Sequence, residues 1–456
     1  MPFLPHTEAD RRSMLEVTGT DSIGDLFAHV PAEVRLARAL ELPPALGEAA
    51  LARHLDGLAA GNARGAAVVP FVGAGAYDHY VPPVVAELAG RAEFYTAYTP
   101  YQPEASQGLL QAIYEYQTMI ASLAGLDAAN ASLYDGATAL AESAMLCVRH
   151  TRRTRVIADA GLHPVWREVL ATYATAAGIE IATVPHAAGA PDVEALAAAI
   201  DDATACVVTA LPNFFGAVAD LEALAGAAHA KRALLAVAAN PLALALVRPP
   251  GAMGADVAFG EGQPLGLPLA YGGPYLGFLA VRSSLVRRLP GRLAGATVDA
   301  DGRRAFVLTL QAREQHIRRE KATSNICSNQ ALCALAAGVY LSLAGPEGLR
   351  EVASHALAKT EYAKRRLAEA GLALRFPDLA TFNEFAVELG RDAEEIFARV
   401  LKKDGIAPGL PLGRFFPELE TALLVAVTEK RTREEIDRLA AALARECRGA
   451  AKGARA

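Results

Sequence analysis

The sequence is short of lysine, and the few lysines it has are unevenly placed. Of its 44 basic residues, 8 are lysine and 36 are arginine, and the first lysine is Lys231. Half of the 456-residue chain therefore contains none. Over the whole chain, an arginine-rich and lysine-poor composition can simply reflect base composition. What bears on function is where lysine is missing.

Cysteine and metal-binding patterns are scarce as well. The five cysteines are scattered and odd in number, which fits reduced thiols in a cytosol rather than a disulfide framework. The ten histidines do not cluster with cysteines or carboxylates at metal-ligand spacing. We therefore predict no metal site.

Three further features are absent. No apolar run reaches the ~18–20 residues that span a bilayer. The first eight residues, MPFLPHTE, contain no basic segment followed by an apolar one, so we expect no export signal and a cytoplasmic protein. The net charge of −6 gives no electrostatic reason to expect nucleic-acid binding.

The middle of the chain predicts an α/β domain. Hydrophobic residues make up 52% and charged residues 21% of the sequence, as in a globular protein. From 131 to 280, short apolar strands alternate with helices near 163–178, 192–202 and 220–231, which indicates a mostly parallel sheet covered on both faces. The strands are expected at Arg155–Ala158, Glu180–Val184, Ala205–Ala210, Ala233–Ala238, Val257–Phe259 and Leu276–Val281.

The two ends of the chain have a different character. Residues 1 to about 60 are expected to form helical pieces with little core, an arm that packs on another subunit. Ser328 is the expected N-cap of a helix that ends before Gly345-Pro346. Beyond it we expect a small α+β unit. The predicted division is an arm and interface segment at 1–95, a large domain at 96–345 and a small domain at 346–456.

Two local motifs suggest a ligand pocket. Asp135-Gly136-Ala137-Thr138 opens a helix, and free amides at a helix N-terminus suit a phosphate, although an ordinary strand–helix turn is equally compatible. His163 follows a strand end, where loops line the cleft of an α/β sheet, although a polar loop histidine is the alternative.

Three longer segments have unusual compositions. Residues 259–275 are rich in glycine and proline, which indicates special backbone angles near a site rather than a plain hairpin. Residues 313–325 begin as a charged, solvated stretch and end in Thr323, Ser324 and Asn325, whose side chains could hold a phosphate or a carboxylate. Tyrosines cluster at 80 and between 95 and 101, as at an interface.

Together these features suggest the aspartate aminotransferase-like fold type I of pyridoxal-phosphate (PLP) enzymes. Over essentially its whole length the chain resembles the N-terminal half of the glycine-cleavage P-protein family (glycine dehydrogenase, decarboxylating), as found in organisms that split that protein into two subunits. The stretches that carry the resemblance are 98–107 with the helix after it, 260–274 and 313–329.

The resemblance indicates why the absence of lysine from a particular position matters for function. A PLP enzyme needs a lysine for its internal Schiff base, and the catalytic half of this family has it in a His-Lys pair before a glycine-rich turn. Matching that turn to Gly272-Gly273-Pro274 places Gln263 at the lysine position. The acid that would pair with the pyridinium nitrogen is missing too, because 233–240 contains no Asp or Glu.

The resemblance therefore implies a subunit without a covalent cofactor of its own. PLP would be held by a homologous subunit 2 in an α2β2 assembly, which decarboxylates glycine and passes the aminomethyl group to the lipoyl group of H protein. Thr323, Ser324 and Asn325 would reach the partner's PLP phosphate. Gly136, Thr138, His163 and Gln263 would form a vestigial pocket. The partner's active-site entrance would be lined by Tyr95, Tyr98, Tyr101, Gln102 and Glu104.

Two alternatives stay open. One is a free-standing PLP enzyme, such as a decarboxylase or a cysteine desulfurase. The missing lysine and acid argue against it, and Cys327 and Cys333 flank or lie in a predicted helix rather than in a mobile loop. The other is a purely structural or regulatory partner that touches no substrate.

Overall fold

The computed structural model describes residues 5–36, 38–62, 68–95 and 97–448, which belong to two units, Met1–Arg64 and Gly65–Ala456. The first unit contains helices α1 (Glu8–Thr18) and α2 (Glu48–Ala60), and neither has a buried residue. Helix α1 begins at a capping box between Thr7 and Asp10. Leucines 51, 55 and 58 of α2 are all exposed, and the described residues of this unit form no core.

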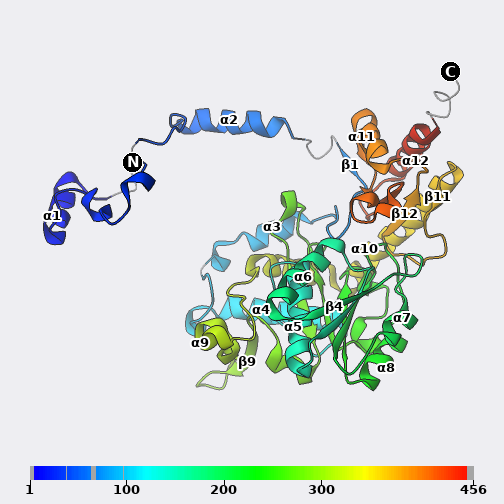
Figure 1. The fold of residues 1–456 in the computed structure, drawn as a ribbon, viewed down its shortest axis with the longest axis horizontal. Coiled ribbons are helices and arrows are strands. Elements are labelled where there is room, and N and C mark those ends of the chain that lie inside the picture. The colour runs from blue at the N-terminus through cyan, green and yellow to red at the C-terminus, as the bar shows by residue number, and fades with distance from the viewer. Residues whose placement is uncertain (1–4, 37, 63–67, 96, 449–456) are drawn as a thin grey trace. The chain divides into compact units, whose positions relative to one another are not determined.

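The second unit is built on a seven-stranded sheet (Figure 1). Its order is β2-β8-β7-β6-β5-β3-β4; the five strands from β7 to β4 run parallel, and β8 and β2 join antiparallel at one edge. All six predicted strands are confirmed. The strands are β2 (Ala128–Ala129), β3 (Arg155–Asp159), β4 (Glu180–Val184), β5 (Thr204–Leu211), β6 (Leu234–Ala239), β7 (Val257–Glu261) and β8 (Gly277–Val281).

Helices cover both faces of this sheet, as the apolar strands predicted. Alternate residues of one strand face opposite cores: Val156 and Ala158 pack under α5 and α6, and Ile157 packs under α7 and α8. Helices α4 and α10 cover the sheet near β8 and β2. The bounds are α4 (Gln107–Ala124), α5 (Gly136–Thr151), α6 (Pro164–Ala177), α7 (Val193–Ala198) and α8 (Glu222–Ala230).

Two elements differ from the sequence prediction. An antiparallel hairpin, β9 (Ala294–Val298) with β10 (Arg304–Leu308), packs its apolar side on α4 and was not predicted. Helix α10 (Ala331–Glu369) begins after Gln330, so Ser328 as N-cap is wrong; the Ser328 amide instead donates to the Tyr134 hydroxyl. The predicted break at Gly345 is present, but the helix resumes directly after it.

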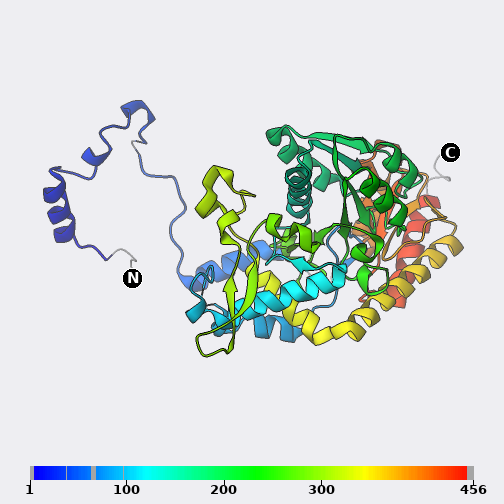
Figure 2. The same ribbon diagram turned by 90° about the horizontal axis from the view of Figure 1, so that it is seen from below.

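Helix α10 links the large sheet to a small one (Figure 2). The small sheet is antiparallel, in the order β11-β12-β15-β14, and packs with α11 (Ala393–Asp404) and α12 (Arg433–Arg448). A separate parallel pair joins β1 (Val69–Pro70) to β13 (Ile406–Ala407). The strands of the small sheet are β11 (Ala373–Leu374), β12 (Glu384–Glu388), β14 (Leu410–Pro411) and β15 (Ala422–Ala426).

One described helix, α10, is long and apolar enough to cross a membrane by length and composition, although no apolar run of that length was found in the sequence. About 44% of its apolar window is buried inside the protein. Its first half packs against α3 (Pro83–Ala89) and α4 and its second half against α12. This burial is that of a core helix.

Candidate functional site

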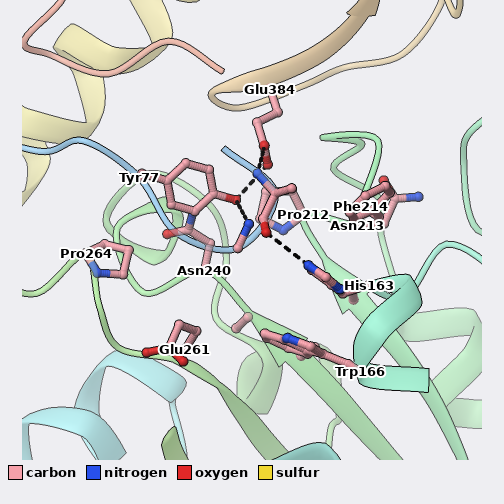
Figure 3. A pocket seen from close by; sticks show the side chains of 15 residues that line it. Tyr77, His163, Trp166, Pro212, Asn213, Phe214, Asn240, Glu261, Pro264 and Glu384 are labelled. Atoms are coloured by element: carbon pink, nitrogen blue, oxygen red, sulfur yellow. Dashed lines mark hydrogen bonds between the residues drawn. The ribbon is translucent and has the colours of Figure 1, made fainter. Parts of the chain in front are cut away.

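A cavity lies at the carboxyl ends of the parallel strands (Figure 3). This is where ligands bind in open α/β sheets. Its volume is about 530 Å³, including its open mouth. Two aromatic residues, two acids and two amides give the cavity its chemistry: Trp166, Phe214, Glu261, Glu384, Asn213 and Asn240. His163 also lines it, whereas Gly136, Thr138 and Gln263 do not.

Glu261 ends β7 and lies against the N-terminus of α5. Its Oε2 accepts the Gly136 amide at 3.0 Å, and its Oε1 accepts the amides of Gln263 and Leu276 at 2.9 and 2.8 Å. The residue is 7% exposed. Burial raises the pKa of Glu261 to about 7, although the three backbone hydrogen bonds favour the carboxylate.

Gln263, at the predicted lysine position, uses its amide to fix the chain near Tyr77. Its Oε1 accepts the Tyr77 amide at 2.8 Å, and its Nε2 donates to the carbonyl oxygens of Tyr77 and Leu267 at 3.0 and 2.8 Å. A lysine ammonium has donors but no acceptor, so it could not make the first bond. Gln263 is 1% exposed and is fully used in holding the fold together.

His163 and Trp166 form the aromatic wall of the cavity. Their rings stack with 5.4 Å between centroids and 15° between planes, since the two residues are three apart at the start of α6. His163 Nε2 lies 2.9 Å from the Ala74 carbonyl oxygen. Its Nδ1 is buried without a hydrogen-bond partner among the described residues. Burial lowers the pKa of His163, so the neutral ring is favoured.

Glu384 reaches the cavity from the first residue of β12, in the small sheet. It accepts the Ala74 amide at 2.6 Å and the Tyr77 hydroxyl at 2.6 Å. Burial raises the pKa of Glu384 to about 7. Glu384, Gln263 and His163 thus hold the same short segment, 74–77, over the cavity.

Replacing Glu384 by Gln is expected to weaken the pH dependence of stability. The folded pKa of about 7 lies above the unfolded value of ~4.3, so the folded chain binds this proton more tightly. Its contribution is fully present below pH ~4 and is lost as the pH rises to about 7. We expect the free energy of unfolding to fall by up to ~4 kcal/mol over that window because of this carboxyl.

Urea denaturation across that pH window measures the effect. E384Q keeps an acceptor for the Ala74 amide and should show a shallower fall than the parent chain. Glu418→Gln, at an exposed position, is the control and should leave the fall unchanged. A fall as steep in E384Q as in the parent would contradict the assignment.

The predicted phosphate-reaching loop is engaged within its own chain. The amide and hydroxyl of Thr323 donate to the Arg313 carbonyl oxygen, at 3.1 and 3.3 Å. Ser324 is buried and donates to Glu142 Oε1 at 2.8 Å. Asn325 is exposed. The hollow beside these residues shares no lining residue with the first cavity, so the structure does not bring this loop to the His163 pocket.

The tyrosine segment lies on the surface. Tyr95, Tyr98 and Tyr101 are 66%, 84% and 50% exposed, and Gln102 and Glu104 are exposed as well. The Tyr98 hydroxyl donates to Ser328 Oγ at 3.3 Å. The Tyr101 ring meets the His316 ring edge-on at 5.7 Å.

The structure thus places two predicted segments, 95–104 and 313–329, side by side. We name the exposed Tyr95, Tyr98 and Tyr101 together the aromatic surface. Tyrosine combines an apolar ring with a polar tip and is enriched in interfaces between proteins.

The cavity residues do not fit PLP. Among the residues that the structure describes, no lysine lines the cavity. The helix end that would receive the phosphate is bonded to Glu261. A Cβ added to Gly136 would lie 2.3 Å from the Trp166 ring, so this ring packs directly against the first residue of the helix.

Several of these residues were missed by sequence reasoning. Glu261 carried a signal, because it directly follows a buried strand. Trp166 carried one as well, since it lies one helical turn from His163. Glu384 and Tyr77 carried no local signal. Their side chains share a hydrogen bond although the two residues are 307 positions apart in the sequence.

Comparison with known proteins places these observations in a family. A family model described as the glycine cleavage system P-protein matches residues 1–443. A probable glycine dehydrogenase (decarboxylating) subunit 1 from Geobacillus kaustophilus is 52% identical over 436 residues, 96% of this chain and 97% of the relative. The corresponding Moorella thermoacetica protein is 52% identical over 443 residues, 97% of this chain and 99% of the relative.

Solved structures agree with this. Glycine decarboxylase (P-protein) of the glycine cleavage system, in inhibitor-bound form, has a TM-score of 0.89 at 47% identity and covers 98% of this chain and 100% of that one. A NifS-like protein, at 15% identity and a TM-score of 0.59, covers 83% of this chain and 99% of that one and shows the fold alone.

The large sheet with its cavity at the strand ends, followed by a small sheet, defines the PLP-dependent transferase fold type I, as predicted. Within that class, the chain belongs to the glycine cleavage system P-protein family. Its full-length similarity to the subunit 1 relatives favours this family over a free-standing decarboxylase or desulfurase.

Proposed function

We propose that this chain is the P-protein subunit that lacks the Schiff-base lysine and completes the PLP site of a homologous subunit 2. The observation that carries the proposal is that Gln263, which the resemblance places at the lysine position, is buried and bonds Tyr77 and Leu267 instead of facing the cavity. The enzyme so formed decarboxylates glycine and transfers the aminomethyl group to the lipoyl group of H protein, whose disulfide takes up the electrons.

Two surfaces of the chain support an obligate partner. The aromatic surface exposes Tyr95, Tyr98 and Tyr101, which would line the partner's active-site entrance. The exposed Asn325 would approach the partner's PLP phosphate together with Thr323 and Ser324. The described residues of the unit 1–64 form no core and expose many large apolar side chains. These side chains would be buried if the unit were an arm that packs on another subunit. We propose an α2β2 assembly in the cytoplasm, with no role for nucleic acid or membrane.

Tyr98→Ala is expected to lower glycine–CO2 exchange at least ~10-fold in the complex reconstituted from this chain, subunit 2 and H protein, without preventing assembly. Tyr98→Phe keeps the ring and should retain most of the exchange. Thr323→Ala and Thr323→Val test the loop in the same exchange assay. Valine keeps the shape of the threonine side chain and loses only the hydroxyl, so it shows whether the hydroxyl itself is needed.

Size-exclusion chromatography of each reconstituted variant shows whether the complex still forms. A Tyr98→Ala complex that assembles and exchanges at the parent rate would support the alternative of a purely structural partner.

A further inference from the structure

The N-terminus of α5 has the groups of an anion site, and the chain's own carboxylates occupy it. The Gly136 amide donates to Glu261 at 3.0 Å and the Thr138 amide donates to Asp135 Oδ1 at 2.7 Å. Unpaired amides and the positive end of a 16-residue helix attract negative charge at such a turn. Here side chains already supply that charge.

Glu261 is fixed in this position from several directions. Besides the amide of Gly136 on α5, it accepts the amides of Gln263 and Leu276. Gln263 lies in the loop after β7, and Leu276 is the residue before β8. If its side chain turned away, three backbone amides in a buried place would lose their partner, which costs ~1–3 kcal/mol each. The carboxylate is therefore a permanent part of the turn.

Trp166 closes the remaining approach to the same amide. A Cβ built on Gly136 would lie 2.3 Å from Cζ2 of Trp166 and 3.1 Å from Cβ of Glu261. The Trp166 ring is in turn held by its stack on His163. Trp166 and Glu261 therefore both pack directly against Gly136.

We propose that Glu261 is a built-in anion that takes the place of an external phosphate at α5, and that together with Trp166 it closes this pocket to phosphorylated ligands. This goes beyond the proposed function, which concerns the missing lysine. It follows that Gln263→Lys alone cannot restore a cofactor site, because the phosphate end stays filled. Removing the Glu261 carboxylate should instead open an anion site.

Inorganic phosphate is the probe, and Trp166 is the reporter because it is the only tryptophan in the chain. The full-length Glu261→Ala chain is titrated with phosphate, against sodium chloride at equal ionic strength. We expect a saturable change in tryptophan emission and a rise of roughly 2 °C in the melting temperature at phosphate about tenfold above Kd. The parent chain should show neither.

Three further variants make the test specific. Glu384→Gln removes the other acid of the cavity and should not respond to phosphate. Glu261→Gln keeps the side-chain volume and should not respond either. Glu261→Ser opens the site, offers a hydroxyl and should respond to phosphate like Glu261→Ala. It replaces the alanine variant in the titration if that chain does not fold.

An equal phosphate response in the parent and in Glu261→Ala would overturn the proposal. So would the absence of a response in a folded Glu261→Ala or Glu261→Ser chain. Because these titrations use the chain alone, their failure is distinguishable from a failure of glycine–CO2 exchange in the proposed complex.

Discussion

A chain carrying Gly216→Ala is expected to unfold at far lower urea concentrations than the parent chain. Gly216 has a φ of +85°, where residues with a side chain are strained. An added Cβ would lie 2.0 Å from the Glu384 carbonyl oxygen, a contact that only a backbone shift relieves. We expect a loss of roughly 3 kcal/mol or more in the free energy of unfolding.

The size of this effect follows from what Gly216 brings together. Its amide donates to the Asn213 carbonyl oxygen at 2.9 Å, and its own carbonyl accepts the Phe382 amide at 3.3 Å. The loop that carries Asn213 and Phe214 therefore lies directly against the segment that enters β12. A displacement here separates two walls of the cavity and the large sheet from the small one.

Gly226→Ala is the matched control. This glycine lies within α8, its φ is not positive, and no atom lies within 4 Å of an added Cβ. Alanine is the better helix former, so we expect a gain of ~0.5–1 kcal/mol. If urea denaturation places Gly216→Ala within about 1 kcal/mol of the parent, the close approach between loop and strand is wrong.

The large sheet was predictable because its strands are buried on both faces. Runs such as 204–211 are buried at every position, mostly apolar and bounded by turns, so local sequence is enough to indicate them. The β9–β10 hairpin gave a weaker signal. Only its Ala294, Phe306 and Leu308 are buried against α4, and the rest of the hairpin is polar or solvent-facing.

Helix ends were less predictable than helices. Ser328 is a good capping residue by type, but its amide is used by Tyr134, and α10 begins at Ala331 without a side-chain cap. Gly345 was identified as a stop because Gly-Pro breaks a helix locally. The helix resumes directly after Gly345 because Leu349, Ala353 and Ala356 are buried in the core beside the large sheet, and no local signal gives this burial.

The site was predictable only where its residues carry local signals. The 135–138 turn and His163 follow strand ends and were identified. That Gln263 bonds Tyr77, or that Glu384 faces the cavity from another sheet, depends on contacts between residues 186 and 307 positions apart. These contacts distinguish a pocket that only lacks a lysine from one in which Gln263 and Glu384 already hold the segment 74–77 in place.

The second large effect concerns the cofactor: we expect no stoichiometric PLP–lysine adduct in this chain. Lys231 is the exposed C-cap of α8, and Lys321 lies in an exposed turn after the glycine-rich loop. Others pair with groups of the fold, as Lys430 does with Asp78 at 2.5 Å. Among the described residues, no lysine lies on the cavity lining, and Gln263 behind it is already engaged with Tyr77 and Leu267.

The most direct measurement is to purify the chain alone, incubate it with PLP, reduce it with borohydride and map the modified peptides. Subunit 2 treated in the same way is the positive control. We predict stoichiometric labelling of one lysine in subunit 2, and only scattered, substoichiometric labelling of surface lysines in this chain. One lysine of this chain labelled to one equivalent, with the matching cofactor absorbance, would contradict the central claim.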